Sequence, residues 1–371
     1  MIPFDECQAL FDADDMERLA ASESGLLWLK IKSVSRKNLL EQLWAFAGLQ
    51  PLSKKTTVKM QFKALYEALP MQVTAAAHDV VDRFIRKNAS MPPAALENIA
   101  SELHKMQSFS WGGDYSNALD KYLVDRYIKK IHTFDGICGQ LQTEIPRAVE
   151  GYVLCSWYNH WTTILIEHVF RQHGKVLPAI GRVKKVDFFV DDIPFDLKTT
   201  YLPANFVEQE RKGARLVSEL VALKRAAKES RICYDRNGRP KDIAYEIAER
   251  IKIEGDEKSR RCLAEISNFR KQILRECQDN PLPLIKNLYE QQGEMRFDAS
   301  NRLFVVLADL DDFDSSWKLK RNPSVLRGGI HAYLDRFSKD DVRRVVFTHK
   351  AKSGEFSAVS DVIFVVAENR D

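Results

Sequence analysis

The chain has 371 residues, of which 45% are hydrophobic and 29% are charged, and its formal net charge is +4. This composition excludes an intrinsically disordered chain and is typical of a folded protein with one large core or two smaller ones. The mildly basic balance permits nucleic-acid binding but does not by itself indicate it.

The six cysteines are scattered and form no C-x-x-C pair, which argues against a disulfide framework or a zinc knuckle. The first residues, MIPFDECQALFDADD, are acidic and lack a long apolar run, so no signal peptide is expected. The longest apolar stretches, such as VIFVVA, are far shorter than the roughly 20 residues of a membrane helix. We therefore expect a cytoplasmic protein without a membrane partner.

Helical spacing of apolar residues dominates the first part of the chain, for example in PPAALENIASELHKM. Residues 1–110 are expected to form a helical N-terminal region that serves recognition or dimerisation. Residues 111–144 are expected to hold a loop and a connecting helix. A long helix should then run from Pro146 to Gly174, because proline favours a helix start and glycine a helix end.

From residue 145 onward the pattern changes to short apolar runs between helices. One helix is expected over 205–230, a polar helical insertion over 231–297, and another helix over 323–337. Strands are expected in five places: 176–190, 193–201, 302–309, 342–349 and 361–368. This order predicts an α/β domain with a mixed sheet over 145–371.

The stretch KKVDFFVDDIPFDLKTT, residues 184–200, mixes strand-forming residues with charges. Asp191 and Asp192 predict a two-residue turn, so residues whose numbers sum to 383 should pair across it. Asp187 is then expected directly opposite Asp196, in the closer type of pair, with Cα atoms roughly 4.5 Å apart.

The register predicts two distinct faces for this hairpin. The apolar face should hold Val186, Phe188, Val190, Ile193, Phe195 and Leu197. The other face should hold Lys185, Asp187, Phe189, Asp196 and Lys198. Facing carboxylates destabilise a sheet by up to about 1 kcal/mol, and a divalent cation between them would reverse that effect. The alternative is an ordinary solvated face balanced by its lysines.

With these positions the stretch resembles the PD-(D/E)XK nuclease superfamily, the group that includes many restriction endonucleases. Asp187 matches the first acid of the family pattern, and Asp196 and Lys198 match its Asp/Glu-x-Lys element. Glu167, on the preceding long helix, matches the helical acid. The residue before the first acid is Val186, where the family pattern has proline.

The resemblance implies a restriction-endonuclease-like mixed β-sheet core flanked by helices. It implies that Asp187, Asp196 and Glu167 bind Mg²⁺, for which Mn²⁺ substitutes, and that Lys198 orients or deprotonates the attacking water. The implied activity is hydrolysis of phosphodiester bonds in double-stranded DNA, most economically by a homodimeric type II restriction enzyme with a companion DNA methyltransferase. A repair or recombination nuclease on the same fold and a non-catalytic DNA-binding protein are the alternatives.

Basic residues that follow the hairpin are candidates for contacts with DNA phosphates, which dominate nucleic-acid affinity. These candidates are Arg211, Lys212, Arg215, Lys318, Lys320 and Arg321. For any one of them a solvated helix face is an equally good interpretation.

A run of acids follows the strand expected at 302–309, namely Asp309, Asp311, Asp312 and Asp314. An apolar strand followed by D-x-D resembles phosphohydrolases of the haloacid dehalogenase type, but too few residues follow to build their sheet. A solvated loop, or acids near a substrate cleft, is the preferred interpretation. His160, His168 and His173 lack the spacing of a zinc site.

Overall fold

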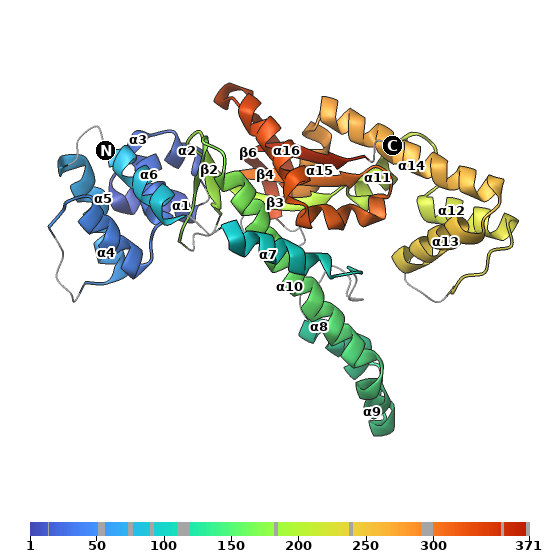
Figure 1. Cartoon of the computed structure of the whole chain (residues 1–371). Helices are drawn as coiled ribbons and strands as arrows, with labels where there is room; N and C mark the ends of the chain where they lie inside the picture. The colour runs from blue at the N-terminus through green and yellow to red at the C-terminus, as the bar shows by residue number, and fades with distance from the viewer. Residues whose placement is uncertain are drawn as a thin grey trace.

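The computed structural model describes residues 1–13, 15–50, 56–72, 77–89, 93–109, 119–181, 185–236, 240–290, 300–349 and 352–368. Within them, helices surround a six-stranded mixed sheet (Figure 1), which confirms the α/β class. Of the connecting segment expected over 111–144, residues 111–118 lie outside the described residues.

The sheet has the strand order β1-β2-β3-β4-β6-β5. Its strands are β1 (Val176–Pro178), β2 (Phe188–Val190), β3 (Ile193–Tyr201), β4 (Arg302–Asp309), β5 (Arg343–His349) and β6 (Lys352–Ala367). The three central strands β3, β4 and β6 run parallel, whereas β1, β2 and β5 join antiparallel. β6 begins at Lys352 rather than near Asp361, because its more polar first half pairs with β5 at the edge of the sheet.

The N-terminal helices α1 to α6 form a bundle with its own core, which we call the N-terminal bundle. The helices of the region are α1 (Phe4–Asp12), α2 (Met16–Ala20), α3 (Glu23–Lys32), α4 (Lys37–Phe46), α5 (Val58–Gln72), α6 (Ala77–Asn88) and α7 (Pro93–His104). Trp28, on α3, is fully buried at the centre of this core among the rings of Phe4 and Phe62. Leu177 of β1 and Phe189 of β2 bury their side chains in the same cluster, so the bundle rests on the hairpin.

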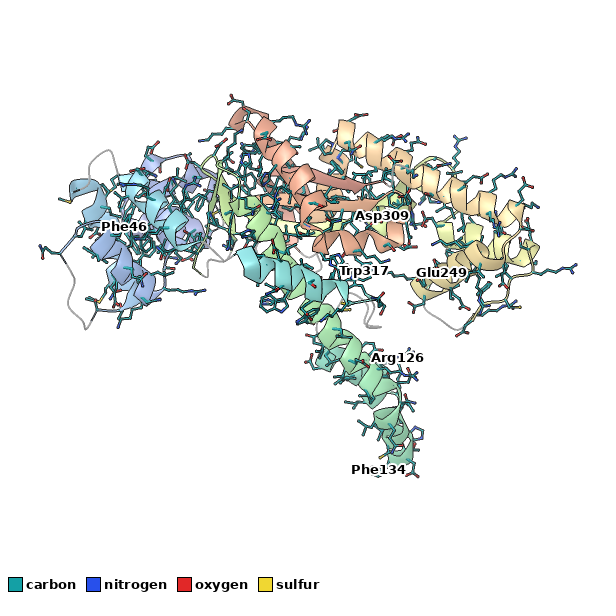
Figure 2. The ribbon with its side chains drawn as sticks, viewed as in Figure 1. Phe46, Arg126, Phe134, Glu249, Asp309 and Trp317 are labelled. Atoms are coloured by element: carbon teal, nitrogen blue, oxygen red, sulfur yellow. The ribbon has the colours of Figure 1, made fainter. Side chains whose placement is uncertain are left out.

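A helical arm extends away from the sheet (Figure 1). It consists of α8 (Leu119–Leu123), the π-helix η2 (Val124–Ile128), α9 (Phe134–Gln142) and the first half of α10 (Glu144–Arg171). Figure 2 shows Phe134 at the far end of this arm. The second half of α10 packs on the sheet through Leu165 and Phe170, which explains why only that half of the helix is well buried.

The helix expected over 205–230 is wrong: two helices replace it. The chain turns after Gly213, and Arg215 takes the left-handed conformation with φ 59°. The helices of this part are α11 (Ala204–Gly213), α12 (Glu219–Glu229), α13 (Pro240–Glu254), α14 (Glu257–Asp279), α15 (Leu282–Glu290) and α16 (Pro323–Arg336), with the 3₁₀ helices η3 (Phe313–Arg321) and η4 (Lys339–Asp341).

Helices cover both faces of the sheet. The second half of α10 and α16 bury one face, and α15 with the end of α14 buries the other. α12, α13 and the start of α14 form a separate cluster away from the sheet, so only part of the expected insertion stands apart. Its last expected residues, 291–297, lie outside the described residues. Within the described residues no helix has the length and apolar character that a membrane span requires.

Candidate active site

The turn and the pairing of the β2–β3 hairpin agree with the sequence prediction. Asp191 and Asp192 occupy the turn with φ values of 44° and 71°, as a type I′ turn requires. The pairs Phe188 with Phe195, Phe189 with Pro194, and Val190 with Ile193 all sum to 383. Pro194 needs no N–H at its position, so the strand tolerates it.

The predicted pairing of Asp187 with Asp196 is wrong, because the regular ladder ends at Phe188. The N–H of Asp187 donates to the carbonyl of Phe195 (2.8 Å), and the N–H of Asp196 donates to Asn301 on the other side (2.9 Å). The Asp187 side chain instead reaches across to β3, where its carboxylate accepts the N–H of Leu197 at 2.7 Å. The two carboxylates are therefore neighbours without being a ladder pair.

The predicted assignment of Val186 to the apolar face that contains Phe188 is also wrong. Val186 buries its side chain with Phe189 in the core of the N-terminal bundle. Phe188 and Phe195 pack on the opposite side, against α10. The irregular backbone at Asp187 breaks the strict alternation of faces, and the N-terminal bundle supplies the apolar surface that covers Val186.

A pocket with a volume of about 480 Å³ lies between α10, β3 and η3. All four residues predicted for the active site line it: Glu167 from α10, Asp187 before β2, and Asp196 and Lys198 from β3. The remaining lining residues are Asn159, Thr162, Thr163, Ile166, Leu197, Thr199 and Lys320. The structure thus brings together in one pocket four predicted residues, of which the first, Glu167, and the last, Lys198, are 31 residues apart in the sequence.

Asp196 is held by two cations and is only 6% exposed. The ammonium of Lys198 donates to its Oδ1 at 2.7 Å, and Nε of Arg302 donates to its Oδ2 at 3.2 Å. The parallel register of β3 and β4 places Arg302 beside Asp196, and the guanidinium stacks over the ring of Tyr289, 5.1 Å from its centroid.

Sequence reasoning missed Arg302. The available signal was an arginine at the start of RLFVVLAD, an otherwise apolar strand. A buried arginine in such a place needs a carboxylate partner. Its Nη1 is buried without a hydrogen-bond partner among the described residues, so the guanidinium is not fully satisfied by Asp196 alone.

The other two carboxylates are disfavoured as anions by their surroundings. Burial, and after it the charge of Asp196, raise the pKa of Asp187 to about 6. Burial also raises the pKa of Glu167, although Arg171 opposes this shift by donating to its carboxylate at 2.8 Å. Desolvation is the largest cause of both shifts, and at Asp187 the neighbouring negative charges of Asp196 and Glu167 add to it.

The side chains of the pocket are chemically suited to Mg²⁺, since three carboxylates supply the hard oxygen ligands that this ion prefers. The described residues contain no group of three His, Cys, Asp or Glu side chains already placed to hold an ion. Lys198 and Arg171 each occupy one of the carboxylates, so binding would require Asp196 and Glu167 to exchange these partners for the ion.

The six basic candidates for DNA contact occupy different environments. Arg211 is buried, and its Nε donates to the carbonyl of Val217, so it does not face solvent as a phosphate contact would require. Arg321 donates to the carbonyls of Leu103 and Met106 at the end of α7.

The remaining four candidates are more accessible. Lys212, Arg215 and Lys318 are exposed, whereas Lys320 is half-buried and lines the pocket. These four side chains are therefore the ones available to a ligand.

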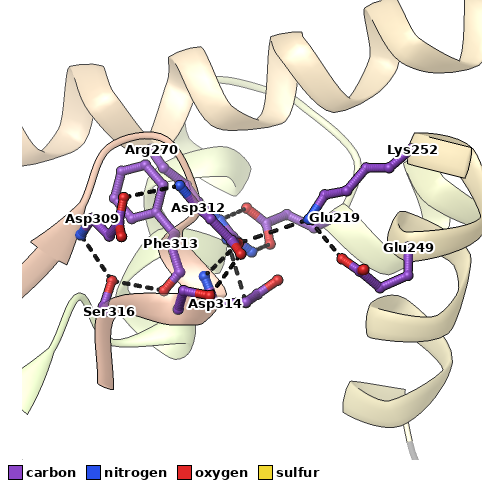
Figure 3. A network of polar contacts seen from close by, with 10 residues as sticks. Glu219, Glu249, Lys252, Arg270, Asp309, Asp312, Phe313, Asp314 and Ser316 are labelled. Atoms are coloured by element: carbon purple, nitrogen blue, oxygen red, sulfur yellow. Dashed lines mark hydrogen bonds and ion pairs between the residues drawn. The ribbon is translucent and has the colours of Figure 1, made fainter. Parts of the chain in front are cut away.

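The acidic loop after β4 binds the separate cluster of helices to the sheet (Figure 3). Asp314 and Asp312 lie near Arg270 and Lys252, at 3.8 and 3.9 Å, and Arg270 also forms two hydrogen bonds with Glu219. Loop N–H groups donate to the carboxylates of Asp309 and Asp312. None of these acids lines the pocket. Their contacts order the loop and attach it to the neighbouring helices.

No family model, no curated protein and no solved structure matches this chain. The function proposed below therefore rests on the sheet and the pocket. The combination of three carboxylates and a lysine around one cavity is the feature that limits the choice of chemistry.

Proposed function

We propose that this protein is a Mg²⁺-dependent endonuclease on a restriction-endonuclease-like core. The observation that carries the proposal is the convergence of Glu167, Asp187, Asp196 and Lys198 on one pocket. Carboxylates with raised pKa values beside a lysine are suited to metal-assisted hydrolysis of a phosphodiester, in which anionic oxygens need a cation to approach.

Each residue has a distinct role in this proposal. Asp187 and Asp196 would hold the ion directly, and Glu167 directly or through water. When bound, Mg²⁺ supplies Lewis-acid polarisation and acidification of water. Lys198, whose ammonium lies at the pocket, orients the attacking water and offsets negative charge that develops on the phosphate.

The proposed substrate is double-stranded DNA, and the proposed role is that of a sequence-specific type II restriction enzyme with a companion methyltransferase. Exposed Lys212, Arg215 and Lys318 supply cations for phosphate contacts. Two chains related by a two-fold axis would offer one pocket to each strand of the duplex, which is why we propose a homodimer.

The direct test is to incubate the protein with unmethylated plasmid DNA, single-stranded DNA and RNA, each with Mg²⁺, with Mn²⁺ or with EDTA. We expect discrete fragments from the duplex with either metal and none with EDTA. Asp196→Asn and Lys198→Met should slow cutting about 10²-fold or more, because they remove an ion ligand and the pocket ammonium.

The chain offers a matched control for these variants. Asp125 and Lys129 form an exposed ion pair on the arm, with the same 2.7 Å separation as Asp196 and Lys198. Asp125→Asn and Lys129→Met should therefore cut like wild type. Cutting at the wild-type rate in both pocket variants would refute the assignment of the site. Metal-independent DNA binding without cutting would favour a non-catalytic binding protein.

A further inference from the structure

Lys320 is a pocket lysine with an unusual set of neighbours. Three carboxylates line the same cavity, yet Lys320 forms an ion pair with none of them, and no other carboxylate pairs with it in the described part of the chain. Lys198, in contrast, is paired with Asp196. Within the described residues, Lys320 is therefore a cation of the cavity without a neutralising carboxylate.

The fold fixes the position of this ammonium. Trp317 and Leu319 are buried and anchor η3 beside α10, which directs Lys320 into the pocket. Its Nζ lies over the rings of Phe109 and Tyr201, 5.7 and 5.2 Å from their centroids.

The partners of this ammonium among the residues that the structure describes are neutral. It donates to the amide oxygen of Asn159 at 3.0 Å, and two aromatic rings cover part of the rest. This desolvation lowers the pKa of Lys320 to about 8. A partly desolvated cation with one neutral acceptor gains more from an anion than a hydrated surface lysine does.

We propose that Lys320 and Asn159 form an anion subsite that holds a backbone phosphate of the bound nucleic acid. The subsite extends the proposed function, on which it rests, by separating two tasks within one cavity. The carboxylates Asp187 and Asp196 attract a cation at one part of the lining, and Lys320 attracts a phosphate at another. Lys320 is thus a positioning residue, because it holds the strand and does not take part in the bond exchange.

A phosphate group offers acceptor oxygens to both side chains of this subsite. The Lys320 ammonium donates to one oxygen, and the amide of Asn159 turns its N–H₂ group toward another once an anion replaces its contact with the lysine. A nucleic-acid backbone also presents such oxygens next to the bond that the carboxylates would address.

The test measures binding of a fluorescein-labelled DNA duplex to the full chain in EDTA by fluorescence anisotropy, so that no cutting interferes. We expect Lys320→Met to weaken binding by about tenfold and Lys320→Arg to restore most of it, because arginine keeps the charge. Lys129→Met is the matched control, since Lys129 is an exposed lysine on the arm, away from the pocket, and its effect should be at most about threefold.

A pH series provides a readout that a merely structural lysine would not change. Wild-type affinity should fall as pH rises from 7 to 9 through the pKa of about 8, because the ammonium loses its proton. Lys320→Arg should remove this dependence. The groups around the ammonium are Asn159, Phe109 and Tyr201, and the charged groups of the pocket lining are Glu167, Asp187, Asp196 and Lys198.

Competition with inorganic phosphate tests whether the subsite binds a phosphate of the DNA backbone or a free phosphate ion. Displacement of DNA only by another duplex supports a backbone subsite, whereas tight Lys320-dependent binding of free phosphate would overturn it in favour of a small anion. Equal DNA affinity of wild type and Lys320→Met, or no DNA binding at all, would overturn the subsite as well.

The outcome for the subsite is distinguishable from the outcome for the proposed function. Lys320-dependent DNA binding without metal-dependent cutting would support the subsite and refute the nuclease. Metal-dependent cutting that Lys320→Met leaves unchanged, together with unchanged affinity, would refute the subsite and support the nuclease.

Discussion

Asp187 is a carboxylate whose ionised form is costly in the folded protein. Burial and the nearby charge of Asp196 raise its pKa to about 6, whereas an unfolded aspartate titrates near 4. Between these two values the folded protein retains a proton that the unfolded chain has released. Stability therefore falls as pH rises through this window, and the full cost is present above pH 6.

Asp187→Asn should accordingly stabilise the metal-free protein. At pH 8 in EDTA we expect the free energy of unfolding to rise by about 1–3 kcal/mol, with a smaller gain at pH 5, where the wild-type carboxyl is largely protonated. Urea unfolding at the two pH values measures the difference. Asp125→Asn, an exposed control on the arm, should leave the free energy of unfolding nearly unchanged. A loss of stability at pH 8 would contradict the electrostatic account of the pocket.

At the residue scale, the sequence predicted which residues line the pocket, but it predicted a strand pairing of Asp187 with Asp196 that the structure does not have. A period of two residues and a two-residue turn were enough to select Asp187, Asp196 and Lys198. The irregular backbone at Asp187 and the burial of Val186 depend on the N-terminal bundle, which lies far away in the sequence. Local periodicity contains no information on such a partner.

At the scale of elements, Lys30 joins three parts of the fold. This lysine of α3 is 2% exposed and donates to Asp82 of α6 (2.9 Å) and to Asp192 in the hairpin turn (2.8 Å). Burial raises the pKa of Asp82, so its charge depends on the lysine for compensation. The N-terminal bundle is thereby fixed to the hairpin that supplies the pocket.

Lys30→Met should destabilise the protein by about 2–3 kcal/mol, less than the loss of a fully buried partner because both aspartates are partly exposed. Lys63→Met is the control, since Lys63 forms an exposed pair with Asp5 and its loss should destabilise the protein much less than the loss of Lys30. Denaturant midpoints of the two variants give the comparison. Equal midpoints would show that Lys30 contributes no more than a surface charge.

Helices and strands were predictable where apolar periodicity was strong. The strands β3 and β4 and the helix α16 lie within a residue or so of their expected bounds. The break between α11 and α12 was missed, although Gly213 at the end of α11 and Ser218 as the N-cap of α12 were signals for it. The place of α15 on the sheet also depends on tertiary contacts, such as Tyr289 stacked on Phe347, and not on its own polar surroundings.

For the whole molecule, the sheet is the common support of several helical bodies (Figure 1). The N-terminal bundle rests on the hairpin, and the separate cluster of α12 and α13 is tied to the loop after β4 through Arg270 and Lys252 (Figure 3). The pocket lies between α10, β3 and η3, so elements from distant parts of the chain position it. Motif spacing indicated two of these elements, and η3 became evident only in the folded structure.

The central claim is that the pocket performs metal-dependent phosphodiester hydrolysis, and Lys198 offers its most direct test. The measurement is the single-turnover cleavage rate of duplex DNA at saturating protein with Mg²⁺, alongside the DNA affinity in EDTA. We predict that Lys198→Met cuts about 10²-fold more slowly or worse while its affinity stays within about threefold of wild type, and that Lys129→Met matches wild type in both. Equal cleavage rates for Lys198→Met and wild type would contradict the account.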